Sequence, residues 1–109
     1  MCDANKSVYR VFKKNEFIKF KKEKLFDGNK IDLYSGFIHL STKTQVEQTI
    51  LRYFNDEKKL IIVELSVSDL KDLLKWEKSR NNMLFPHFFG TLKYEWVKTI
   101  IKKEPSYEL

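Results

Sequence analysis

Residues 59–66, KLIIVELS, form an almost unbroken apolar run near the middle of the chain. A strand with one face in water alternates apolar and polar side chains, whereas a strand covered on both faces is apolar throughout. The run therefore predicts a central strand with packing layers on both sides. The rest of the sheet has to be found in the segments that precede and follow it.

The flanking segments predict further strands and two helices. Residues 7–12 (SVYRVF) and 94–103 (YEWVKTIIKK) are rich in residues that favour strands. A helix fits residues 15–25, and a second helix begins after Thr42, which has capping-box spacing to Gln45. The second helix repeats its apolar residues with helical spacing. These residues are Val46, Ile50, Tyr53 and Phe54.

The remaining stretches predict shorter elements. The sequence FDGNK, around Gly28, is typical of a turn. Residues 67–74 suit a short helix capped by Ser68, and residues 75–79 suit a short strand. Residues 80–90 (RNNMLFPHFFG) start with polar residues, contain a proline and end in glycine, so we expect a loop.

Length and composition agree with one globular domain. The chain has 109 residues, of which 42% are hydrophobic and 33% charged. We expect a single α+β domain over residues 1–109, with a mixed or split β-sheet packed by two or three helices. About residues 1–6 are expected to be a frayed N-terminus, and residues 105–109 a C-terminal tail.

Composition also restricts location and partners. No apolar run approaches the roughly 20 residues that span a bilayer, and the start lacks the apolar core of a secretion signal. We therefore expect a cytoplasmic protein with no membrane partner. The single Cys2 leaves no internal disulfide and no cysteine-based metal motif. The two histidines are far apart in the sequence with no obvious carboxylate partner, so no metal is expected. The net charge of +6 permits an anionic partner, and the lysines of residues 12–24 are either a phosphate-attracting surface or a solvated helix face.

The first of the two histidines lies in SGFIHLST, residues 35–42. If residues 36–41 are extended, His39 and Ser41 point to the same side of the strand. They would lie beside the helix that opens at Thr42, whose unpaired N–H groups attract an anion. Gly36 would let a ligand approach the backbone. This arrangement suits a ribose or a phosphate group.

The second histidine, His87, follows a proline and precedes two phenylalanines in LFPHFFG. Aromatic walls such as Phe88 around one polar group are typical of a small-molecule pocket. We expect both histidines to face one concavity, although both can instead be hydrogen-bonded core residues. Four further residues are weaker ligand-binding or catalytic candidates. They are Arg52, Glu77, Arg80 and Glu95.

Three stretches together resemble a known family. GFIHLSTKTQVEQTILRYF (36–54), LLKWEKSR (73–80) and LFPHFFG (84–90), in this order and spacing, are similar to domain of unknown function 952, an uncharacterised bacterial family. The resemblance covers nearly the whole chain and implies an ADP-ribosyltransferase-like fold with NAD as a possible cofactor. In that fold His39 would hold a ribose hydroxyl and His87 would lie on the nicotinamide side. Glu95, at the start of the last predicted strand, only partly matches the glutamate that many such enzymes carry there.

Three functions remain open from the sequence. The two histidines with an apolar third position resemble the RNA 2′-phosphotransferases, so NAD-dependent ADP-ribosyl or RNA 2′-phosphate transfer is the leading hypothesis. Those enzymes use several arginines, whereas this chain has three. A module that binds a nucleotide or another phosphorylated ligand without turnover is the second possibility. The third is a two-histidine phosphoesterase: HLST matches the His-x-Ser/Thr half-motif, but His87 is followed by Phe88 and Phe89.

Overall fold

The central strand predicted from KLIIVELS is present as β4 (Leu60–Ser66), between β1 and β8. The structure is a computed structural model that describes residues 6–103, so the predicted tail and most of the predicted frayed N-terminus lie outside the described residues.

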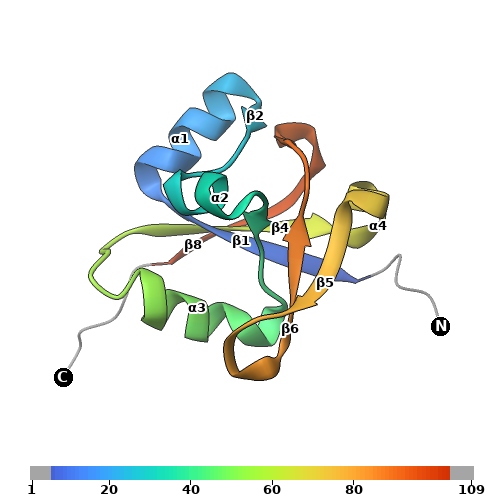
Figure 1. Cartoon of the computed structure of the whole chain (residues 1–109). Coiled ribbons are helices and arrows are strands. Elements are labelled where there is room, and N and C mark those ends of the chain that lie inside the picture. Colours follow the sequence, from blue (N-terminus) through green and yellow to red (C-terminus); the bar gives the residue numbers. More distant parts are fainter. Residues whose placement is uncertain (1–5, 104–109) are drawn as a thin grey trace.

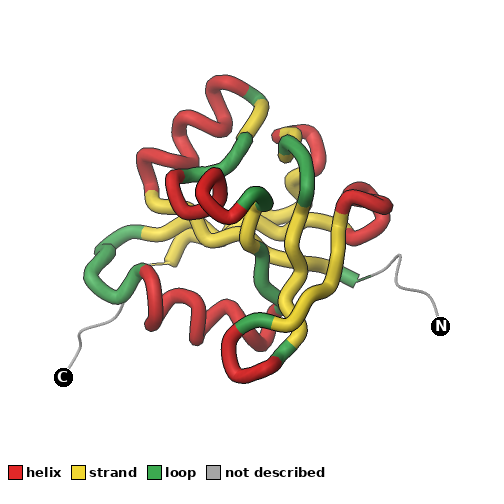
Figure 2. The backbone as a smooth tube through the Cα atoms, in the orientation of Figure 1, coloured by secondary structure: helices red, strands yellow, loops and turns green. Residues whose placement is uncertain are grey.

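Figures 1 and 2 show the elements. The strands are β1 (Ser7–Lys13), β2 (Leu25–Phe26), β3 (Ile38–His39), β4, β5 (Leu74–Lys78), β6 (Leu84–Phe88), β7 (Leu92–Lys93) and β8 (Val97–Lys103). The α-helices are α1 (Lys14–Glu23), α2 (Lys30–Ser35), α3 (Val46–Tyr53) and α4 (Val67–Leu70).

The two faces of β4 pack against different layers, as its apolar sequence predicts. Ile61, Val63 and Leu65 belong to a core cluster that also contains the phenylalanines of α1. Leu60 and Ile62 belong to a second cluster with the apolar side of α3. Figure 1 shows α1 and α3 on opposite sides of the β1–β4–β8 sheet. The fold is therefore α+β, with the sheet between helical layers.

The described strands form three small sheets, and all of their pairings are antiparallel. The sheet is therefore split, and the mixed alternative is not observed among residues 6–103. One sheet has the order β1-β4-β8, a second pairs β2 with β7, and a third has the order β3-β6-β5. A single bridge between Tyr9 of β1 and Ser41 connects the first sheet to the segment after β3. This bridge holds the third sheet beside the first.

The prediction of a loop over residues 80–90 is wrong for its second half. Leu84–Phe88 form β6, the middle strand of the third sheet, with Pro86 opposite Trp76 of β5. Pro86 accepts a hydrogen bond from the Leu40 N–H at 3.1 Å, so its backbone faces the β3 side. Proline has no N–H to donate to a neighbouring strand. Because β3 ends at His39, the regular pairing of β3 with β6 has already stopped at Pro86, so no pairing hydrogen bond is lost there.

Two other local predictions are corrected, and one helix was not predicted. The N-cap residue of the helix after β4 is Ser66 rather than Ser68. The helix ends before Lys71, which has a φ of 55°. The last strand begins at Val97 because residues 94–96 form a 3₁₀ turn, in which the Tyr94 N–H donates to Lys24 at 2.8 Å. The short helix α2, directly after the predicted turn at Gly28, was not expected from the sequence.

Candidate functional site

The site begins with the short helix α2, which fixes Asp32 in the interior. Asn29 caps the helix: its side-chain oxygen accepts from the Asp32 N–H at 3.1 Å, and its own N–H donates to Asp32 Oδ2 at 2.7 Å. This reciprocal pair is a capping box. Gly36 ends the helix with a φ of 89°, a conformation that glycine adopts without strain. Asp32 is thus held with only 2% of its surface exposed.

Arg10 of β1 neutralises Asp32. Its Nη1 and Nη2 atoms lie 3.0 and 2.8 Å from Asp32 Oδ1 and Oδ2, a bidentate pair in which both side chains are buried. Nη1 also donates to the carbonyl of His39 at 3.0 Å. Burial raises the pKa of Asp32, but the hydrogen bond from His39 and the charge of Arg10 outweigh burial, so the pKa lies below its usual range. Asp32 is therefore an ionised carboxylate that only accepts hydrogen bonds.

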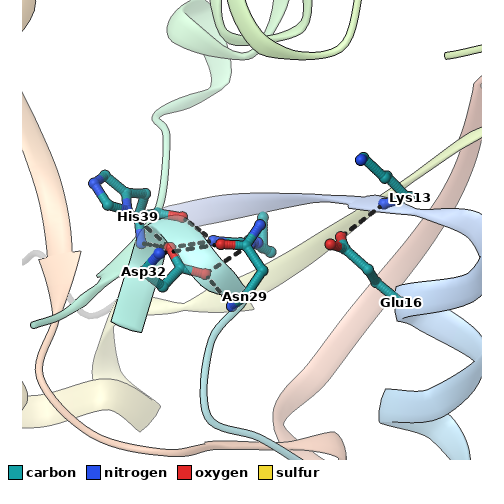
Figure 3. Close-up of polar contacts among 6 residues, drawn as sticks. Lys13, Glu16, Asn29, Asp32 and His39 are labelled. Carbon is teal, nitrogen blue, oxygen red and sulfur yellow. Dashed lines mark hydrogen bonds and ion pairs between the residues drawn. The ribbon is translucent and has the colours of Figure 1, made fainter. Parts of the chain in front are cut away.

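Asp32 in turn orients the ring of His39. The His39 backbone N–H donates to Asp32 Oδ1 at 3.0 Å, and ring Nδ1 lies 2.7 Å from the same oxygen. Because an ionised carboxylate can only accept, Nδ1 carries the proton, and in the neutral ring Nε2 holds the lone pair. Figure 3 shows one edge of the His39 ring toward Asp32 and the other pointing away. The side chain is 40% exposed, so this second edge is accessible to a ligand.

A second carboxylate orients His87 in the same way. Its Nδ1 lies 2.7 Å from Oε1 of Glu77, which is on the neighbouring strand β5. The His87 side chain is 6% exposed and that of Glu77 is 46% exposed. The Phe37 ring stacks on His87 with a centroid distance of 4.0 Å and fixes the plane of the imidazole. In both histidines a carboxylate therefore lies at Nδ1, and Nε2 is turned away from that carboxylate.

The two histidines are direct cross-strand neighbours. His39 of β3 pairs with His87 of β6, and their ring centroids are 5.7 Å apart. Both line one pocket with a volume of about 90 Å³, between β1, α2, α3 and β6. Its polar lining residues are Arg10, Asn29, Asp32, His39, Ser41, Thr49, Ser79 and His87, and its aromatic ones are Tyr53, Phe54 and Phe85. A drug-sized ligand occupies a pocket of roughly 300–1,000 Å³, so this pocket has room only for a small group such as a phosphate with the adjoining part of a ribose.

Several residues singled out from the sequence meet at this pocket. His39, Ser41 and His87 line it, and Glu77 contacts His87. Ser41 is buried, and its hydroxyl lies 2.9 Å from the Thr49 hydroxyl. The expectation that the two histidines share one concavity is therefore confirmed by their placement, while their chemical roles stay predictions.

Other predicted site residues lie elsewhere. Gly36 caps α2, and the Thr42 N–H donates to Gln45 at 3.0 Å, so neither forms part of the pocket wall. Phe88 is fully buried and packs on Trp96, because its side chain lies on the opposite face of β6 from His87. Glu95 is exposed in the 3₁₀ turn before β8 and does not line the pocket.

The two remaining candidates belong to the region beside the pocket. Arg52 is exposed on α3, and its Nε donates to the Tyr53 hydroxyl at 3.3 Å. Arg80 opens the 3₁₀ turn Arg80–Asn82, which connects β5 to β6. Arg52 is not among the residues that line the two-histidine pocket.

Sequence reasoning missed Asp32 and Arg10, the pair on which His39 depends. The spacing of Asn29 and Asp32 is that of a helix cap, so the segment after Gly28 carried a signal for α2. Arg10 stands inside the strand-forming run SVYRVF, where a charged residue on a buried face requires a partner. The identity of that partner depends on the tertiary fold.

The fold and the site define an α+β protein with a split antiparallel sheet and a pocket that contains two carboxylate-bound histidines. Its sequence places it in a family: residues 11–100 match the model described as protein of unknown function (DUF952), and the chain belongs to that family. A search of curated proteins found no match.

Solved structures with the same fold are similar to this chain. The crystal structure of protein CC0527 from Caulobacter crescentus aligns with a TM-score of 0.88 at 29% identity, over 93% of this chain and 89% of that chain. The solution structure of CC0527 aligns with a TM-score of 0.83 at 29% identity, over 93% and 87% of the two chains.

Within residues 6–103, no helix has the length and apolarity needed to cross a membrane. In the same part of the chain, no group of three or more histidine, cysteine, aspartate or glutamate residues is arranged to hold a metal ion.

Proposed function

We propose that this protein is an enzyme that performs acid–base catalysis on a phosphorylated ribose, with His39 and His87 as the acid and the base. One observation carries the proposal: both imidazoles line one pocket, and each has its Nδ1 at 2.7 Å from a carboxylate oxygen. A carboxylate at Nδ1 fixes the tautomer and directs Nε2 to the reacting group. A purely structural role for one histidine does not require this arrangement twice in the same cavity.

The reaction that suits two such histidines is the hydrolysis of a 2′,3′-cyclic phosphate. One neutral imidazole takes a proton from water, whose oxygen forms a new bond to phosphorus. The other imidazole, in its protonated form, gives a proton to the ribose oxygen as the bond from phosphorus to that oxygen breaks. The product is a ribose monophosphate, and the net reaction consumes one water without a cofactor. This mechanism corresponds to the two-histidine phosphoesterase alternative.

The pocket supports a ligand of this class by its size and lining. About 90 Å³ accommodates a phosphate with the adjoining part of a ribose. The Ser41 and Thr49 hydroxyls, which hydrogen-bond each other at 2.9 Å, give the wall of the same pocket a polar character. The flat side chains of Tyr53 and Phe85 offer apolar surface to a base or a sugar.

The test is the steady-state hydrolysis of uridine 2′,3′-cyclic phosphate by the wild type, His39→Gln and His87→Gln. Each substitution is expected to lower kcat by about 10²–10⁴-fold, the usual contribution of a general acid or base. The exposed Lys22 lies on α1 and does not line the pocket, so Lys22→Gln is the matched control and should retain the wild-type rate. No turnover by the wild type, or equal rates in the wild type and both histidine variants, would refute acid–base catalysis on this substrate.

A second candidate is NAD-dependent transfer of an ADP-ribosyl group or an RNA 2′-phosphate. The family resemblance implies an ADP-ribosyltransferase-like fold, and the aromatic lining at Tyr53 and Phe85 suits a nicotinamide ring. The exposed position of Glu95 argues against a glycosidic cleavage that depends on this carboxylate. Nicotinamide release from NAD, measured with and without 2′-phosphorylated RNA, tests this candidate. Release that is lost in His39→Gln would favour it over cyclic phosphate hydrolysis.

Binding without turnover is the remaining alternative. A ligand that binds only the folded state raises the melting temperature by mass action. If uridine 3′-phosphate, NAD or ADP-ribose stabilises the wild type but not His39→Gln, and no substrate is turned over, the pocket belongs to a binding module.

A further inference from the structure

A second hollow lies beside the two-histidine pocket. It is an open groove of about 490 Å³ lined by Gln48, Leu51 and Arg52 of α3 and by Asn81. Asn81 belongs to the 3₁₀ turn between β5 and β6 and has a φ of 55°. In Figure 1 this turn lies next to α3. We call this hollow the α3 groove.

Two segments, α3 and the connection between β5 and β6, contribute residues to both the α3 groove and the pocket. On α3, Thr49 and Tyr53 line the pocket, while Arg52 lines the groove. Residues three apart on a helix are neighbours on its surface, so Arg52 lies beside Thr49. In the connection between β5 and β6, Ser79 lines the pocket and Asn81, two residues later, lines the groove. The two hollows are therefore adjacent along these two segments.

Arg52 is placed to bind an anion in the α3 groove. Its Nε donates to the Tyr53 hydroxyl at 3.3 Å, and its guanidinium carbon lies 5.6 Å from the centre of the Tyr53 ring. These contacts hold the guanidinium beside Tyr53, which lines the pocket. They involve Nε and the guanidinium plane but not the two terminal amino groups. These two groups are the ones that can donate a pair of parallel hydrogen bonds to two phosphate oxygens. Gln48 and Asn81 add uncharged amide groups on the two sides of the groove.

We propose that the pocket and the α3 groove form one continuous site for the 3′ end of an RNA chain. The terminal ribose phosphate occupies the pocket, and Arg52 binds the phosphodiester that precedes it. This inference rests on the proposed function, because it takes the pocket to hold a ribose phosphate. It adds that the substrate is an oligonucleotide end, which the small pocket cannot enclose, rather than a free mononucleotide.

The test compares the binding of two RNA products by isothermal titration calorimetry. The probes are uridine 3′-phosphate and the dinucleotide that carries one more uridine, joined through a phosphodiester, on its 5′ side. The wild type should bind the dinucleotide about tenfold more tightly, the effect of one added hydrogen bond to a charged group. In Arg52→Gln this ratio should fall to about one, and the salt dependence of dinucleotide binding should decrease by about 0.7 in logarithmic slope. Lys22→Gln, which also removes one exposed positive charge, should keep the wild-type ratio.

The outcomes separate this inference from the proposed catalysis. Equal affinity for the two probes in the wild type, no binding of the dinucleotide, or a preference that survives Arg52→Gln would overturn the role of the groove. A dinucleotide preference that depends on Arg52 supports the groove even if cyclic phosphates are not hydrolysed, and only the catalytic proposal then fails. Hydrolysis without any dinucleotide preference rejects the groove and leaves the catalytic proposal standing.

Discussion

Asp32 is the residue on which the candidate site depends most. Its carboxylate accepts hydrogen bonds from Asn29, from both Arg10 amino groups, and from the backbone and ring of His39. It thereby joins the cap of α2, a charge inside β1 and the orientation of a histidine. A change at this residue should affect both stability and function.

Replacing Asp32 by asparagine should destabilise the protein by about 3–5 kcal/mol, because it leaves the buried Arg10 without a counter-charge. Urea denaturation of the wild type and Asp32→Asn measures this loss. The double variant Arg10→Met with Asp32→Leu removes both charges and should lose less than Asp32→Asn alone. The average substitution lowers the free energy of unfolding by about 1 kcal/mol. If the free energy of unfolding of Asp32→Asn lies within about 1 kcal/mol of the wild-type value, the ion pair does not stabilise the fold as we infer.

The same residue predicts how stability depends on pH. The pKa of Asp32 is lower in the folded state than its unfolded value of about 3.9, so below that value the unfolded chain binds more protons. The contribution of Asp32 is fully present above the unfolded pKa and is lost as the pH falls through the folded pKa. From about pH 6 to about pH 3, the free energy of unfolding should therefore fall more in the wild type than in Asp32→Asn. Parallel curves for the two proteins would contradict the depressed pKa.

At the scale of elements, the sequence predicts what depends on local pattern. The run in β4, the strand in residues 7–12 and the capped helix after Thr42 were all predicted and are observed. The strand β6 was not predicted, because a proline argues against a central strand. Only the tertiary pairing shows that β3 stops opposite Pro86. The two histidines were identified from their unusual surroundings. Glu77, the partner of His87, was among the weaker candidates, but Asp32, the partner of His39, was not identified, because it reaches His39 from α2, an element that was not predicted.

The turn before α2 provides a test at this scale. Gly28 and Gly36 both have positive φ, 117° and 89°, so alanine at either position costs about 1–2 kcal/mol of backbone strain. A Cβ on Gly28 would also lie 2.7 Å from the Cβ of Asp32, whereas a Cβ on Gly36 would meet no atom within 4 Å. Gly28→Ala should therefore lose more stability than Gly36→Ala in thermal denaturation, and it should also lower activity by displacing Asp32. Equal losses would show that the contact with Asp32 relaxes without cost.

At the scale of the whole molecule, the pocket exists because separate layers meet there. β1 supplies Arg10, α2 supplies Asp32, and the third sheet brings His39 and His87 side by side. The bridge between Tyr9 and Ser41 holds that sheet against β1, with backbone hydrogen bonds of 2.7 and 2.8 Å. The site is thus a property of the assembled fold, and any ligand of the pocket should stabilise the domain as a unit.

The central claim, that both histidines act together on one ligand, is tested most directly by nuclear magnetic resonance of their ring nitrogens. The chain contains only two histidines, so a long-range proton–nitrogen correlation spectrum contains one ring pattern for each. Both neutral rings should carry their proton on Nδ1, as the contacts with Asp32 and Glu77 require. Titration with uridine 3′-phosphate should then shift both ring patterns with one common dissociation constant. A response of only one ring, of neither, or of the two rings with different dissociation constants would contradict a shared catalytic site.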